Sequence, residues 1–99
     1  MESVPQYLEF AKALISFLKT TLSEQGETTW NGRRVKFEIK PTTKPKNIFK
    51  GDLMMWYCKV DDVTSGERAR ADDYKSRAGA LEHAVDHLAG KLRSKGILQ

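Results

Sequence analysis

The run LMMWYCKV, residues 53–60, is the most apolar stretch of the chain and decides how its neighbours are interpreted. Its aromatic and β-branched residues favour a strand, and apolar residues on both faces at its start indicate a central strand covered on both sides there. Residues 61–66 are typical of a turn, and residues 67–71 continue as the next strand of a hairpin. A helix is expected from about Asp73, so this region predicts a strand, a turn, a second strand and a closing helix.

The closing helix carries one continuous apolar stripe. The residues of this stripe, at helical spacing, are Leu81, Ala84, Val85, Leu88 and Leu92. Asp72, Asp73 or Ser76 is suited to cap the start of the helix. In the preceding strand Ala69 and Ala71 share one face, and their small side chains leave room for a helix to approach closely. We therefore expect the closing helix to pack on that face.

The N-terminal region predicts a helix of about twenty residues. Ser3 is placed to cap it, Gln6 completes a capping box, and Gly26 is a suitable stop. The stripe expected to face the core consists of Leu8, Ala11, Leu14, Ile15, Leu18 and Leu22. Phe10 and Phe17 lie off this stripe and share a helix face, so they either widen the stripe or form a second contact surface.

Two further strands are expected between this helix and the apolar run. The dipeptide Asn31-Gly32 is a strong hairpin signal, because both central residues of a type I′ turn need positive φ. Residues 28–30 precede it as a short strand, with Trp30 as an exposed aromatic. In the strand that follows, apolar and charged residues alternate, which indicates one buried face. The apolar positions are Val35, Phe37 and Ile39. Residues 41–51 are expected to form a loop.

Together these elements predict an α+β fold with the order α-β-β-β-α. We expect an antiparallel sheet of three strands, with residues 28–30 as a fourth short one, and both helices packed on one face. The 99 residues suit a single domain, residues 1–99. Cys58 is the only cysteine, which excludes an intrachain disulfide. No membrane span or secretion signal is recognised, so a cytoplasmic protein is expected.

The positive charge of the chain is concentrated in its middle. The formal net charge is +4, yet residues 27–60 alone carry eight Lys and Arg against three acidic residues. Lys40, Lys44, Lys46 and Lys50 lie in or beside the expected loop at residues 41–51. Such clustering is expected of a surface that binds phosphate groups, and it is equally typical of a loop that lysines keep soluble.

No pattern of catalytic or metal-binding residues stands out in the chain. His83 and His87 have the helical spacing of two metal ligands, but no further His or suitable Cys completes such a site. There is no glycine-rich phosphate loop. We therefore expect a protein that is not an enzyme and uses no metal or cofactor. Trp56 and Tyr57 are interpreted as core residues rather than as stacking platforms for nucleobases.

The element order and the second half of the chain resemble the double-stranded RNA-binding domain. The local likeness lies in residues 56–60, in the turn that ends at Gly66, in residues 67–71 and in the basic, alanine-rich segment 75–80. In that family a duplex contacts the first helix, the loop between the first two strands, and the start of the second helix. The resemblance implies contacts here from Gln6, Glu9, Lys44, Lys46, Lys50, Lys75 and Arg77.

Two functions follow as hypotheses. The first is a small nucleic-acid-binding protein that engages duplex or structured RNA through phosphate contacts of the basic loop, Lys40 included, and of a helix N-terminus. The alternative is a protein–protein interaction module, an adaptor or inhibitor of the kind encoded by phages and mobile elements, with Phe10 and Phe17 on its contact surface. A homodimer is compatible with either.

Overall fold

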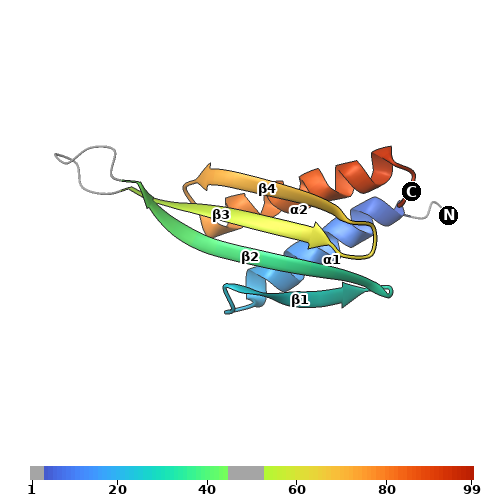
Figure 1. Cartoon of the computed structure of the whole chain (residues 1–99), viewed down its shortest axis with the longest axis horizontal. Coiled ribbons are helices and arrows are strands. Elements are labelled where there is room, and N and C mark those ends of the chain that lie inside the picture. Colours follow the sequence, from blue (N-terminus) through green and yellow to red (C-terminus); the bar gives the residue numbers. More distant parts are fainter. Residues whose placement is uncertain (1–3, 45–52) are drawn as a thin grey trace.

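The computed structural model describes residues 4–44 and 53–99. Its elements are α1 (Gln6–Thr20), β1 (Gln25–Trp30), β2 (Arg33–Lys44), β3 (Leu53–Asp62), β4 (Glu67–Tyr74) and α2 (Arg77–Ser94). Within these residues the strands form one antiparallel sheet in the order β1-β2-β3-β4, and both helices lie on the same face of it (Figure 1). The predicted α+β fold is confirmed, and the expected short fourth strand is the full edge strand β1.

The turn between β1 and β2 has the predicted geometry. Asn31 and Gly32 have φ values of 49° and 76°, as a type I′ turn requires. Gly26 lies within β1, so the prediction that it ends the first helix is wrong. The Phe37 ring crosses Gly26 so closely that a Cβ atom added there would lie 3.0 Å from Phe37 Cζ. A glycine therefore lets β1 pass beside this ring without displacing it.

The core lies between one face of the sheet and the two helices. The alternation predicted in β2 and β4 is confirmed, because these apolar side chains are all buried against the helices. The buried strand residues are Val35, Phe37, Ile39, Cys58, Val60, Ala69 and Ala71. The predicted stripe of α2 is also buried throughout, and Ser76 caps this helix by accepting a hydrogen bond from the Gly79 backbone N–H at 2.9 Å. α2 begins at Arg77, three to four residues later than expected, because β4 continues to Tyr74.

The apolar stripe of α1 differs from the predicted one. Phe10 is completely buried and packs edge-on against Trp30, with ring centroids 5.5 Å apart. Leu8 remains 43% exposed and Leu22 is 99% exposed. α1 is shorter than expected and ends at Thr20, so Leu22 lies beyond it in extended chain. The predictions that Leu8 and Leu22 face the core, and that Trp30 is exposed, are therefore wrong; the expected cap Ser3 lies outside the described residues.

The two helices run antiparallel to each other. Each strand added to an antiparallel meander reverses the direction of the element that follows, and with four strands α2 starts where α1 ends. The Arg77 guanidinium, at the start of α2, donates to the backbone oxygens of Leu18 (2.7 Å) and Thr21 (3.0 Å). At the opposite end the Tyr7 N–H donates to Gln99 O at 2.9 Å (Figure 1).

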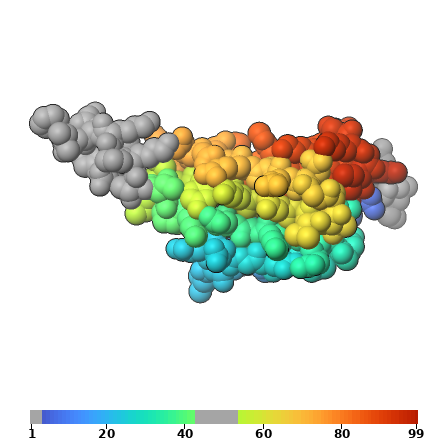
Figure 2. Space-filling model, in the orientation of Figure 1, coloured from blue at the N-terminus to red at the C-terminus, as the bar shows by residue number. Residues whose placement is uncertain are grey.

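Among the described residues both helices lie on the same face of β3, and Met54 near its start is 60% exposed, which corrects the expectation of cover on both sides there. Trp56 is half-buried against the core, whereas Tyr57 lies on the face that no helix covers. Residues 41–44, expected as loop, extend β2 and pair with β3 as far as Lys44 and Leu53. Figure 2 shows this uncovered side, on which the four strands form successive bands across the surface.

Candidate nucleic-acid interface

The sheet narrows to two strands at the end where β2 finishes and β3 begins. β1 pairs with β2 only as far as Glu38, and β4 pairs with β3 only as far as Trp56. Residues 41–44 and 53–55 continue beyond both as a two-stranded arm (Figure 1). A two-stranded β-ribbon is one of the shapes that enters the major groove of duplex DNA.

Two of the predicted lysines lie at the base of this arm. Lys40 is opposite Tyr57, and Lys75 directly follows Tyr74, which is opposite Trp56. Lys75 is exposed and makes no ion pair with the described residues, while the Lys40 ammonium lies 3.8 Å from a Glu38 carboxylate oxygen. Lys44 closes β2, but its side chain, like Lys46 and Lys50, lies outside what the structure describes.

The acidic residues beside Lys75 are less of an obstacle to phosphate binding than their number suggests. The Arg70 Nε group donates to both carboxylate oxygens of Asp72, at 2.7 and 2.8 Å, which compensates this negative charge. Asp73 adopts a φ of 62° where β4 ends, a conformation that aspartate tolerates better than most residues. Lys75 therefore faces less net negative charge than the sequence suggests.

Arg77 has a structural role. Its two contacts with the last carbonyl groups of α1 satisfy acceptors that a helix C-terminus leaves open, and its side chain is partly buried by them. A phosphate group would have to compete with both hydrogen bonds. We therefore do not count Arg77 among the available cations.

Gln6 and Glu9 lie at the far end of the molecule from Lys75. Gln6 is at the start of α1, where its side-chain oxygen accepts a hydrogen bond from the Gln99 N–H at 3.5 Å. Fifteen helical residues separate the ends of α1, a rise of about 22 Å. The structure therefore places Lys40 and Lys75 at one end of the molecule, and Gln6 and Glu9 at the other.

The uncovered face of the sheet, called the open face below, carries opposite charges in alternation. One row across the four strands, read from the strand register, consists of Glu27, Lys36, Asp61 and Arg68. The next row consists of Gln25, Glu38, Lys59 and Arg70. Opposite charges on neighbouring strands stabilise a sheet, so much of this charge serves the fold.

Hydrogen bonds on the open face shift the pKa of two groups. The Tyr57 hydroxyl donates to the Glu38 carboxylate, and this bond is the main reason why the pKa of Glu38 lies below its ordinary value. The same bond raises the pKa of Tyr57, with burial adding to the effect. The Arg70 guanidinium lies 4.9 Å from the centre of the Tyr57 ring. The hydroxyl of Tyr57 is thus bonded to Glu38 and its ring face is occupied by Arg70. The ring is therefore not available to stack on a base.

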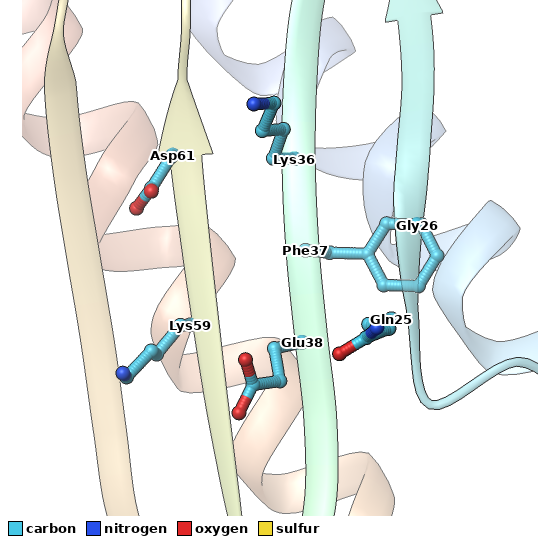
Figure 3. Close-up of a pocket in the computed structure, with 7 residues that line it drawn as sticks. All are labelled: Gln25, Gly26, Lys36, Phe37, Glu38, Lys59 and Asp61. Carbon is cyan, nitrogen blue, oxygen red and sulfur yellow. The ribbon is translucent and has the colours of Figure 1, made fainter.

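Shallow hollows lie on the open face and share Asp61 in their linings. One, of about 460 Å³, lies between Gly26, Lys36, Glu38 and Lys59 (Figure 3). Another, of about 440 Å³, is lined by Lys59, Arg68, Arg70 and Lys91 with Asp61 as the single acid. These cations of β3 and β4 were not predicted as a group from the sequence. The period-two alternation used for β2 would have found them.

Other candidate groups are engaged or buried. His83 Nδ1 lies 2.8 Å from Gly79 O, and the ring stacks on Tyr74 with centroids 4.4 Å apart. Within residues 4–44 and 53–99 no three His, Cys, Asp or Glu side chains are grouped as metal ligands, and no helix there is long and apolar enough to cross a membrane. Burial raises the pKa of the Cys58 thiol to about 12, so this thiol is unreactive at neutral pH.

The chain was also compared with known proteins. No family model, no curated protein and no solved structure matches it. The function is therefore argued from the residues themselves.

Proposed function

We propose that this protein binds nucleic acid, duplex or structured RNA, through phosphate contacts made at the arm end of the molecule. Lys40 and Lys75 are the described contacts, and Lys44, Lys46 and Lys50 are the further ones expected. The observation that carries the proposal is that Lys75 lies at the base of the β2–β3 arm, exposed and unpaired within the described residues. Lys40 and Lys44, two of the lysines among residues 27–60, belong to the part of β2 that leads into this end.

The physical basis is electrostatic. Lysines that contact phosphates release counterions from the nucleic acid, so the affinity falls steeply as salt is raised and depends little on sequence. The N-terminus of α2 adds the partial positive charge of its dipole next to Lys75. Because Asp72 is held by Arg70, this positive field is opposed less than the sequence alone suggests.

The test is a fluorescence-anisotropy titration of a short RNA duplex at several salt concentrations. We expect the double variant Lys40→Glu/Lys75→Glu to weaken binding and to lower the slope of log K against log salt by about two, one for each lost phosphate contact. The matched control is Lys12→Glu, which reverses an exposed lysine of α1 away from this end. Binding that ignores salt, or an equal loss in the control, would contradict the proposal.

The alternative, a protein-interaction module, draws support from a different surface. Phe17 is 38% exposed and Leu22 is 99% exposed. Phe10 cannot take part as the sequence suggested, because it is buried and its replacement by Asp would unfold the core. The informative substitution is Leu22→Asp, which should abolish retention of a protein partner in a pull-down while leaving the fold and the RNA affinity unchanged.

A further inference from the structure

The outer edge of β1 presents backbone groups that no neighbouring strand of the described chain pairs. The Ile39 N–H donates to Glu24 O at 2.6 Å, so the backbone groups of the even-numbered residues turn toward β2. The N–H and C=O groups of Gln25, Glu27 and Thr29 therefore point out of the sheet. An unprotected edge of this kind pairs readily with another strand.

β1 lacks several of the features with which proteins usually protect an edge. It contains no Lys and no Pro, and its register with β2 runs without a bulge from Gln25 to Trp30. Its one charged side chain, Glu27, is held by the Arg34 guanidinium at 2.5 Å. Two exposed apolar side chains precede this strand: Phe17 in the last turn of α1, and Leu22 in the segment between α1 and β1.

We propose that two copies of the chain pair through β1, antiparallel, about a twofold axis at Thr28, so that the two sheets become one. In this register Glu27 lies opposite the partner's Thr29, and each such pair exchanges two backbone hydrogen bonds. Gly26 lies opposite the partner's Trp30, and the two Thr28 residues face each other.

Charge and strand geometry select this register over its neighbours. Only registers that set odd-numbered residues opposite one another bring the outward-pointing groups together. An axis at Glu27 would place two carboxylates directly opposite, which is unfavourable. An axis at Gly26 would leave Thr29 beyond the end of the partner strand. With the axis at Thr28, both Glu27 side chains face threonines.

The apolar side chains beneath β1 fit the same register. The Phe17 ring packs edge-on against Phe37 at 5.7 Å, and the Phe37 ring in turn crosses Gly26. The partner's Trp30, placed opposite Gly26, would approach the exposed side of this aromatic group. The pairing therefore combines backbone hydrogen bonds with the burial of apolar surface, which a lone six-residue strand could not supply.

The first test measures association by sedimentation equilibrium over a wide range of protein concentration. We expect a concentration-dependent dimer whose dissociation constant rises about tenfold or more in Thr29→Pro, which removes an outward N–H and leaves the β1–β2 hydrogen bonds intact. Thr29→Val is the matched control, because it keeps the N–H and the β-branched shape. A chain that stays monomeric at every concentration, or equal association of the two variants, would overturn the proposal.

The second test reports the register. Opposed residues at a non-hydrogen-bonded antiparallel position have Cα atoms about 4.5 Å apart, within reach of a disulfide. Thr28→Cys should therefore form a covalent dimer on mild oxidation, whereas Thr29→Cys, whose two copies are offset along the strands, should not. Cys58 is buried and does not compete. Equal crosslinking of both variants, or of neither, would overturn the proposed register, and far-UV circular dichroism checks that each variant is folded.

Discussion

The two edges of the sheet are treated very differently by the rest of the chain. At β4 the Lys91 ammonium reaches over from α2 and donates to Arg68 O at 2.6 Å, and Lys95 pairs with Glu67. The β3–β4 register also shifts between Trp56 and Cys58, an irregularity that disturbs any regular outer edge. At β1 the ion pair given by the described residues joins Glu27 to Arg34 of the neighbouring strand β2, and no helix side chain takes part in it.

The difference between the two edges indicates a role for the basic residues at the end of α2. Lysines in the last turns of a helix are usually explained by the helix dipole. Here Lys91 and Lys95 also close the β4 edge, because α2 runs back along that side of the sheet. In the described part of the chain α1 contributes no such side chain to β1, and the outward backbone groups of that edge have no neighbouring strand.

The largest loss of stability is expected from disrupting the turn between β3 and β4. Asp62 is completely buried and accepts hydrogen bonds from Arg33 at 2.6 Å and from the Ser65 hydroxyl at 2.5 Å. Asp62→Ala should lower the free energy of unfolding by about 3–5 kcal/mol, because it leaves the arginine without its partner. Urea denaturation measures this, with Asp61→Ala on the open face as the control, for which a change within about 0.5 kcal/mol is expected. Equal losses in the two variants would show that the buried pair does not hold the turn.

A smaller loss of stability is expected from a substitution in the edge strand β1. Gly26→Ala should destabilise by about 1–3 kcal/mol, because the new Cβ meets the Phe37 ring. Gly90→Ala should have the opposite sign and stabilise by about 0.5–1 kcal/mol, since nothing lies within 4 Å of a Cβ at this exposed position of α2. Thermal or urea unfolding of the two variants measures both changes in stability. If both variants were stabilised, or both destabilised, the prediction would be contradicted.

Opening the β4 edge should cost less stability but alter association. Lys91→Met removes the donor to Arg68 O, and we expect a loss of about 1 kcal/mol or less because the contact is exposed. To detect association through β4 alone, both this variant and the control Lys12→Met carry Thr29→Pro, which blocks association through β1. If Lys91 protects the β4 edge, the Lys91→Met protein should associate more strongly than the control. Sedimentation measures the difference, and identical behaviour would show that β4 needs no such protection.

The smallest effect is expected in the middle of the sheet, away from both edges. Tyr57→Phe removes the hydrogen bond that mainly lowers the pKa of Glu38, so this pKa should return toward its ordinary value. Because the folded pKa is depressed, the associated stability is present above the unfolded pKa of about 4.5 and is lost as the pH falls through the folded value. An NMR titration of the Glu38 carboxyl carbon tests this, and an unchanged midpoint would contradict it.

The fold could be predicted largely because its signals are local. The Asn31-Gly32 turn, the alternation along β2 and the stripe of α2 each depend on residues close in sequence. The stripe of α1 could not be chosen in the same way, since Leu8 fits helical spacing with Ala11 and Ile15, whereas Phe10 fits it with Leu14 and Leu18. Packing against Trp30 decided in favour of Phe10, and that contact is set by the sheet.

The candidate interface was less accessible to sequence reasoning for a topological reason. Lys75 lies near a helix start as predicted, and Lys40 and Lys44 lie in β2, but whether Gln6 joins Lys75 depends on the direction of α2. That direction depends on counting residues 25–30 as a full strand. The engagement of Arg77 with α1 also joins residues more than fifty positions apart, which no local pattern records.

The cap that Arg77 provides has a consequence for how the chain folds. The end of α1 is capped by a side chain from the start of α2, so this cap can form only after the intervening strands have brought α2 beside α1. Contacts between distant segments of this kind slow folding, because the intervening chain must first be ordered. Until then Phe17, Leu22 and the bare strand β1 are exposed together, and we expect this N-terminal third to be the part most prone to misassembly in the unfinished protein.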